Sequence, residues 1–233
     1  MNEQKVMLQV SDSTVMQAHI ARPAGEAPRP GLIVLQEAFG VNRHIRDVAR
    51  RFAEQGYCAI APELFHRTAP PGFEGDYGDF PSVMPHVNAV VEKTAEPDLR
   101  AAFDWLQAQP LVRRDEISCL GFCMGGRLAF LANAVLPLRA AVSYYGGGVA
   151  AQLLDRAPAL RAPILFFWGE KDKHIPPEQR RQITDALKQH GKTFVNVEFS
   201  DADHGFFCDQ RASYHAAAAR QSWALTLEFL RAS

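Results

Sequence analysis

The chain has 233 residues, of which 47% are hydrophobic and 22% charged, and its formal net charge at pH 7 is −1. This length and hydrophobic content predict one domain with a full core over residues 1–233. The balanced charge argues against a nucleic-acid-binding surface, and no stretch has the pattern of a signal peptide or a membrane span. We therefore expect a cytoplasmic protein with neither nucleic-acid nor membrane partners.

The four cysteines, Cys58, Cys119, Cys123 and Cys208, are scattered along the chain. Such a distribution does not indicate a disulfide framework, and no paired Cys-x-x-Cys motif supports zinc. There is also no histidine-rich ligand set. The cysteines are therefore expected to be reduced thiols, and no metal site is predicted.

The first part of the chain alternates between strand and helix patterns. Residues 5–10 and 14–21 alternate apolar and polar side chains, which predicts an antiparallel hairpin. The run 31–35 is continuously apolar, as expected of a strand buried on both faces. Asn42 can cap a helix that Gly56 ends, and 57–61 is the next buried strand.

The stretch 62–85 is rich in Pro, Gly and aromatic residues and lacks regular periodicity. A loop of this length inside a compact domain is usually a lid or a pocket wall. Two helical patterns follow, over about 82–94 and 97–109.

The second part continues the alternation. Strands are predicted up to Phe122, over 138–144, 163–169 and 193–200, and helices from Cys123 to about 135, over 177–190 and from about 213. Strands that alternate with helices predict an α/β fold in which helices cover both faces of a mostly parallel sheet, with an antiparallel hairpin at the N-terminus. Functional residues are expected at the carboxyl ends of the strands.

One stretch, Ile117 to Arg127, combines an apolar strand, a tight turn and a helix. It contains Gly121-Phe122-Cys123-Met124-Gly125-Gly126, the Gly-x-Cys-x-Gly-Gly form of a nucleophile elbow with cysteine in place of serine. Gly121 and Gly125 would let the strand and helix pass closely around a strained Cys123. The helix that begins after Cys123 directs unpaired N–H groups toward the sulfur and favours the thiolate.

A cysteine nucleophile needs a base and a carboxylate that orients the base. Cys123, Asp172 and His204 each follow a predicted strand, in the chain order typical of α/β hydrolases. We interpret them as a catalytic triad. Other acids that could orient the base are Glu170, Asp201 and Asp203, and His174 is an alternative base.

Glu37 also follows a predicted strand, in a loop that would supply part of an oxyanion hole. The backbone N–H groups of Ala38 and Met124 are the predicted donors. Because a carboxylate beside an oxyanion hole opposes negative charge, we expect Glu37 to control the ionisation or orientation of the Cys123 thiol.

Taken together, Gln36-Glu37-Ala38-Phe39-Gly40-Val41-Asn42, the Cys123 elbow, Asp172 and His204-Gly205-Phe206 resemble the dienelactone hydrolase (carboxymethylenebutenolidase) family over nearly the whole chain. The resemblance implies an α/β-hydrolase fold and hydrolysis of a lactone or ester through an acyl-cysteine intermediate. It implies a small-molecule substrate, no cofactor, a monomer or weak homodimer, and a role in aromatic degradation. It assigns the triad to Cys123, Asp172 and His204, and the thiol-partner role to Glu37.

The sequence departs from the family in the residues that bind a substrate carboxylate. The family holds this group with two arginines, one in the lid region and one four residues beyond the histidine, where this chain has Cys208. Glu74, Asp76 and Asp79 make the lid region acidic. The predicted substrate-binding residues are Phe39, Arg67, Tyr77 and Phe206.

Two other functions remain open. The first is a general carboxylesterase or thioesterase for neutral acyl groups, which the aromatic residues of the lid region would suit. The second is a non-catalytic binding or redox-sensing protein with an oxidisable Cys123. A complete triad argues against sensing, because a redox-sensing thiol needs no oriented base.

Overall fold

The computed structural model describes residues 1–233. Contacts within the chain divide it into two compact units, Met1–Cys119 (unit 1) and Leu120–Ser233 (unit 2). The boundary lies inside a strand. The expected single domain stays a prediction.

Unit 1 contains the first three helices, the first four strands and most of the fifth strand. Its elements are β1 (Asn2–Gln9), β2 (Val15–Arg22), β3 (Arg29–Leu35), α1 (Arg43–Glu54), β4 (Cys58–Pro62), α2 (Phe80–Ala89), α3 (Glu92–Ala108) and β5 (Val112–Phe122), whose last three residues belong to unit 2. The hydrogen-bonded strand order is β1-β2-β4-β3-β5. The hairpin of β1 and β2 is antiparallel, as predicted, and β3 and β4 are parallel.

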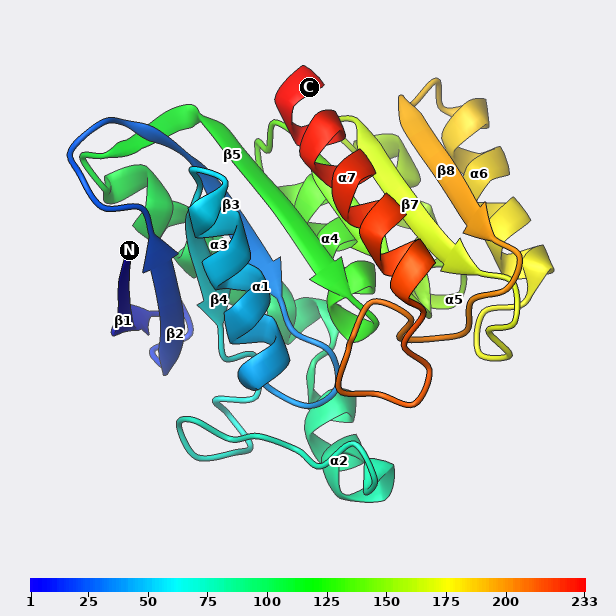
Figure 1. The fold of residues 1–233 in the computed structure, drawn as a ribbon, viewed down its shortest axis with the longest axis horizontal. Helices are drawn as coiled ribbons and strands as arrows, with labels where there is room; N and C mark the ends of the chain where they lie inside the picture. The colour runs from blue at the N-terminus through cyan, green and yellow to red at the C-terminus, as the bar shows by residue number, and fades with distance from the viewer. The chain divides into compact units, whose positions relative to one another are not determined.

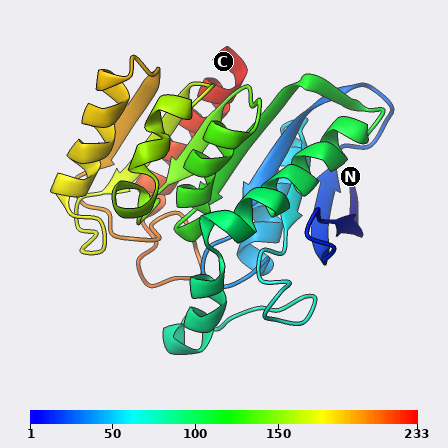
Figure 2. The same cartoon turned by 180° about the vertical axis from the view of Figure 1, so that it is seen from behind.

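Helices cover both faces of the unit 1 strands. Helix α1 packs on β2 and β4, and α3 packs on β4 from the opposite side, as the two views show (Figure 1 and Figure 2). The predicted start of α1 is confirmed, because Asn42 Oδ1 accepts a hydrogen bond from Ile45 N at 3.2 Å. Gly56, just beyond the end of α1, has a positive φ of 98°.

The boundary between α2 and α3 differs from the prediction. Helix α2 ends at Ala89 rather than near residue 94, and α3 begins at Glu92 rather than at Pro97. Thr94 explains the difference, because its hydroxyl accepts from Val91 N and donates to Ala89 O, which ends one helix and starts the next. Proline favours a helix start, but here Pro97 lies inside the helix.

Unit 2 carries the remaining strands and helices. They are α4 (Met124–Val135), β6 (Ala141–Tyr144), α5 (Val149–Gln152), a 3₁₀ helix (Leu154–Ala159), β7 (Ile164–Gly169), α6 (Pro177–Gln189), β8 (Phe194–Phe199) and α7 (Ala216–Ala232). Strands β6, β7 and β8 are parallel, with α7 on one face and α4 and α6 on the other (Figure 1 and Figure 2). All six residues of β7 are buried, as the sequence predicts.

The last helix begins three residues later than expected, at Ala216, with the His215 side chain as its N-cap. Two of the residues expected on its buried side, Trp223 and Leu227, are only partly buried. Polar Ser222 and Thr226 face the core instead. Tyr144 makes this possible, because its hydroxyl donates a hydrogen bond to Ser222 O at 3.1 Å and lies 2.6 Å from Thr226 Oγ1. The buried polar groups are thereby paired.

Candidate active site

Cys123 occupies a strained turn between β5 and α4. Its φ and ψ are 54° and −116°, a conformation that residues with a side chain rarely adopt. The backbone holds it there: Cys123 N donates to Tyr144 O at 3.0 Å, and Arg127 N donates to Cys123 O at 3.2 Å. The predicted strand, turn and helix around Cys123 are therefore present.

Glycines make the turn sterically possible. A Cβ on Gly121 would lie 2.1 Å from Gly125 O, so these two residues pass too closely for any side chain. A second contact was not predicted: a Cβ on Gly126 would lie 2.5 Å from Tyr144 O and 2.9 Å from Gly146 Cα. The run of three glycines after β6 was the signal in the sequence for this close approach.

Two loops at strand ends bring Asp172 and His204 together. His204 Nδ1 lies 2.7 Å from Asp172 Oδ2. Asp172 is only 4% exposed, and its other oxygen accepts a hydrogen bond from His174 N at 2.8 Å. Asp172 is thus fixed on both oxygens and orients the imidazole so that Nε2 is the ring nitrogen available to other groups.

His204 also hydrogen-bonds the Cys123 side chain. Burial lowers the pKa of His204, but the charge of Cys123 and the hydrogen bonds to Asp172 and Cys123 outweigh burial and raise it to about 10. Burial raises the pKa of Asp172, but the hydrogen bond and charge of His204 outweigh burial and lower it. The arrangement favours a protonated His204 imidazole beside the Asp172 carboxylate.

Two residues near this group were missed by the sequence interpretation. Tyr145 has a positive φ of 39° and its ring centroid lies 5.1 Å from that of His204. Arg127 is electrostatically coupled to Cys123, and it donates a hydrogen bond to Gln152 at 2.6 Å. Arg127 follows the elbow motif directly, so its position one helical turn beyond Cys123 could have identified it.

Glu37, in unit 1, is fully buried, and the Tyr77 hydroxyl donates to its Oε2 at 3.5 Å. The lid region packs against the loop that follows β3 and carries Glu37. The ring centroids of Phe39 and Tyr77 are 4.5 Å apart, and Gly75 N donates to Phe39 O at 3.0 Å. Ala38 is buried in this cluster. The roles of Glu37 and Ala38 toward Cys123 stay predictions.

Arg67 forms an ion-pair network within unit 1. Its guanidinium donates to both oxygens of Asp98 at 2.8 Å and to Asp12 Oδ2 at 2.7 and 2.9 Å. Asp98 is fully buried and also lies 3.2 Å from His66 Nε2. Asp98 and Asp12 raise the pKa of Arg67 further above its usual value, despite partial burial. The predicted contact of Arg67 with substrate is not tested by this arrangement.

The model of the dienelactone hydrolase family matches residues 16–233. The chain belongs to this family. A relative in Synechocystis, provisionally named a carboxymethylenebutenolidase, is 36% identical, and the match covers 88% of this chain and 87% of the relative. A relative of the same provisional name in Escherichia coli K12 is 37% identical over 93% and 82% of the two chains.

A solved structure supports the same assignment. The crystal structure of a provisionally assigned dienelactone hydrolase from Klebsiella pneumoniae has a TM-score of 0.87 and 34% identity, covering 99% of both chains. The predicted α/β-hydrolase fold is therefore confirmed, and the protein is a carboxylic ester hydrolase of the dienelactone hydrolase family. No helix in the chain is long and apolar enough to cross a membrane.

Phe206, a predicted substrate contact, and Cys208, which replaces an arginine of the family, both lie in unit 2 and are buried. Phe206 is fully buried, with its ring centroid 5.2 Å from that of Tyr145. Cys208, where members of the family place an arginine, is also fully buried. The side chain of Cys208 supplies no positive charge, and a substrate contact of Phe206 stays a prediction.

Proposed function

We propose that this member of the family cleaves its ester or lactone substrate with a Cys123, His204 and Asp172 triad. The observation that carries the proposal is the 2.7 Å contact between His204 Nδ1 and Asp172 Oδ2, together with the hydrogen bond of His204 to Cys123 at a strained elbow. A nucleophile, an oriented base and a buried carboxylate are the three parts that acyl transfer needs.

In the proposed reaction the Cys123 thiolate attacks the carbonyl carbon and forms a tetrahedral oxyanion. Backbone N–H groups of Met124 and Ala38 stabilise this oxyanion, each contributing roughly 3 kcal/mol. The carbon–oxygen bond to the leaving group breaks as His204 gives its proton to the leaving oxygen. His204 then takes a proton from water, which attacks the thioester and releases the acid and free Cys123.

Glu37 is proposed to set the ionisation or orientation of Cys123 before substrate binds. Its complete burial supports the proposal, because a buried polar side chain needs hydrogen-bonding partners inside the protein. The test is Glu37→Gln, measured by the pH dependence of kcat/KM and by the rate at which iodoacetamide alkylates Cys123. If neither changes, Glu37 has no such role.

Two substrate classes compete. The provisional names of the relatives favour a lactone such as dienelactone. A neutral ester or thioester is favoured by the Cys208 side chain and by the pairing of Arg67 with two carboxylates, since neither leaves a free cation for a substrate carboxylate. Phe39, Tyr77, Phe206 and Arg67 remain the proposed substrate contacts, with the aromatic residues suited to an apolar acyl group.

The deciding experiment compares initial rates on p-nitrophenyl acetate and dienelactone for the native protein and Cys123→Ala. Turnover by the native protein that Cys123→Ala loses supports the triad, and the preferred substrate selects the class. Equal activity of the native protein and Cys123→Ala would contradict the proposed triad. Absence of turnover combined with rapid peroxide oxidation of Cys123 would instead favour a redox-sensing protein.

A further inference from the structure

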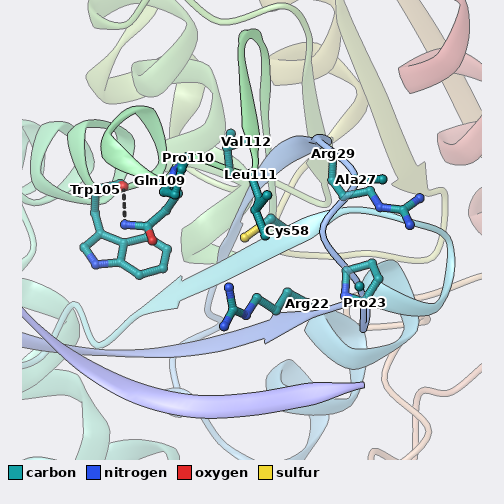
Figure 3. Close-up of a pocket in the computed structure, with 11 residues that line it drawn as sticks. Arg22, Pro23, Ala27, Arg29, Cys58, Trp105, Gln109, Pro110, Leu111 and Val112 are labelled. Carbon is teal, nitrogen blue, oxygen red and sulfur yellow. Dashed lines mark hydrogen bonds between the residues drawn. The ribbon is translucent and has the colours of Figure 1, made fainter.

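A cleft in unit 1 lies at the N-terminal ends of β3 and β4. Its walls come from the end of β2, the connection to β3, the first residue of β4, the end of α3 and the start of β5 (Figure 3). The space between these walls, open solvent included, is about 390 Å³. The Gln36–Asn42 loop follows the other end of β3, so this cleft is separate from the loop that carries Glu37.

Arg22 ends the buried face of β2. Because side chains alternate along a strand, Arg22 shares a face with Met16, Ala18 and Ile20, all fully buried. An arginine in this register carries its positive charge to the edge of an apolar layer. Figure 3 shows its guanidinium extending to the side of the cleft where Trp105 and Gln109 lie.

The Arg22 side chain has no acidic partner. Its Nε is buried and has no hydrogen-bond acceptor. Other arginines of unit 1, such as Arg46, Arg50 and Arg67, pair with carboxylates. A buried donor without an acceptor is unfavourable, so a ligand that brings an acceptor to the Arg22 guanidinium would be favoured.

The remaining walls are largely apolar. Trp105, Pro110 and Leu111 line one side, and Pro23 and Ala27 line the other. Cys58 lies between them, and burial raises its pKa to about 11, so its thiol adds no negative charge near neutral pH. Arg29 lines the cleft too, but its guanidinium points away from that of Arg22 (Figure 3).

We propose that this cleft binds a small aromatic carboxylate. The carboxylate accepts hydrogen bonds from the Arg22 guanidinium, which offers donors in the fork geometry that carboxylates match. The ring lies among Trp105 and the proline and leucine side chains, where apolar area is removed from water. A bare phosphate would leave these apolar walls without a partner.

The experiment uses the native 15N-labelled protein and follows its three tryptophan indole N–H signals by NMR. The Trp105 signal is assigned with Trp105→Phe. Benzoate, benzamide and inorganic phosphate are titrated separately at constant ionic strength. Benzoate is expected to shift the Trp105 signal saturably and to leave the Trp168 and Trp223 signals in place. Benzamide, which has the ring without the charge, and phosphate are each expected to bind at least about tenfold more weakly.

Arg22→Gln is expected to weaken benzoate binding by at least about tenfold, the effect of losing a charged hydrogen bond. The matched control is Arg181→Gln, which removes an exposed arginine on α6 that pairs with Glu178. The Arg181→Gln variant should bind benzoate with the native affinity. If Arg22→Gln fails to fold, Ala27→Trp decides, because it leaves Arg22 intact and fills the mouth of the cleft. Loss of benzoate binding in Ala27→Trp supports the proposal.

Three results would overturn the proposal: no saturable shift of the Trp105 signal, equal affinity for benzoate and either benzamide or phosphate, or unchanged benzoate affinity in the folded Arg22→Gln or Ala27→Trp variant. None of these results depends on ester hydrolysis, so the cleft and the triad are tested separately.

Discussion

At the scale of single residues, hydrogen-bond contacts distinguish Asp172 and His204 from the neighbouring acid Asp203 and the neighbouring histidine His174. Asp203, next to His204, accepts only from the His204 backbone N, whereas Asp172 contacts the imidazole itself. His174 contributes its backbone N–H to Asp172, and its ring centroid lies 5.4 Å from that of His204. The geometry therefore favours Asp172 over Asp203 as the orienting acid, and His204 over His174 as the base.

Asp172→Asn should lower kcat/KM by about 10³- to 10⁴-fold, because an amide in this position stabilises the tautomer in which Nε2 cannot accept a proton. KM should change little. The measurement is steady-state ester hydrolysis, with Asp203→Asn as the matched control, which should keep near-native activity. A loss of less than tenfold in Asp172→Asn would contradict the proposed triad.

The raised pKa of His204 predicts a specific pH dependence. A free imidazole is mostly neutral at pH 8, but a group with a pKa of about 10 keeps its proton there and loses it only as the pH approaches 10. NMR of the His204 ring should show this titration directly, and kcat/KM should fall at still higher pH because the proton donor for the leaving group is gone. In Cys123→Ala the titration should move to lower pH, since the Cys123 charge is the largest effect that raises this pKa. Titration of native His204 below pH 7 would refute this account.

At the scale of elements, the Cys123 elbow depends on backbone segments that pass at contact distance. Gly121 lies against Gly125, and Gly126 lies against Gly146 after β6. The first pair is local in sequence and is visible in the elbow motif. The second joins two elements about twenty residues apart, so spacing alone could not predict it.

Gly121→Ala should destabilise the protein by about 1–3 kcal/mol or more, because the new Cβ would lie 2.1 Å from Gly125 O, a backbone atom that cannot rotate away. Gly147→Ala is the matched control: its Cβ would lie 3.5 Å from the nearest atom, a side-chain carbon of Ile175, and its stability should stay close to native. Urea unfolding of the two variants measures the difference. Equal stabilities would show that the backbone at the elbow can relax.

On the scale of the whole molecule, long-range ion pairs fix the irregular lid region within unit 1. Arg67 lies in that region, Asp12 in the β1–β2 turn and Asp98 on α3, so one guanidinium connects three segments distant in sequence. Glu63 adds a second anchor by accepting from Gly72 N at 2.8 Å. These contacts therefore fix the first part of the long stretch, before α2 begins at Phe80.

Arg67→Gln should lower the free energy of unfolding by about 3–5 kcal/mol, because it leaves the buried Asp98 carboxylate without its main partner. Arg100→Gln, on the same helix as Asp98, removes an exposed ion pair with Glu96 and should cost less than about 1 kcal/mol. Chemical denaturation of both variants is the measurement. A small loss in Arg67→Gln, accompanied by a higher KM, would favour a direct substrate contact for Arg67 instead.

The sequence by itself determined the alternation of strands and helices, the N-cap at Asn42, the elbow at Cys123 and the candidate positions of Asp172 and His204. These features depend on residues close together in the chain, on apolar periodicity and on the steric demands of glycine. The helix boundary at Thr94 and the polar face of α7 were missed, because a local side-chain bond and the buried Tyr144 hydroxyl outweigh intrinsic preferences there.

The sequence favoured Asp172 among several acids as the partner of His204, and the tertiary structure brings Asp172 to the imidazole. Only the tertiary structure decided that Arg67 pairs with Asp98 and that Arg22 lines a cleft without an acidic partner. Each depends on residues from separate elements, and charged groups find partners according to how those elements pack. Periodicity predicts which face of a strand or helix is buried, but it carries no information about which charge lies opposite. For that reason the positions of Cys123, Asp172 and His204 followed from the sequence, whereas the ion-pair partners of Arg67 followed from the fold.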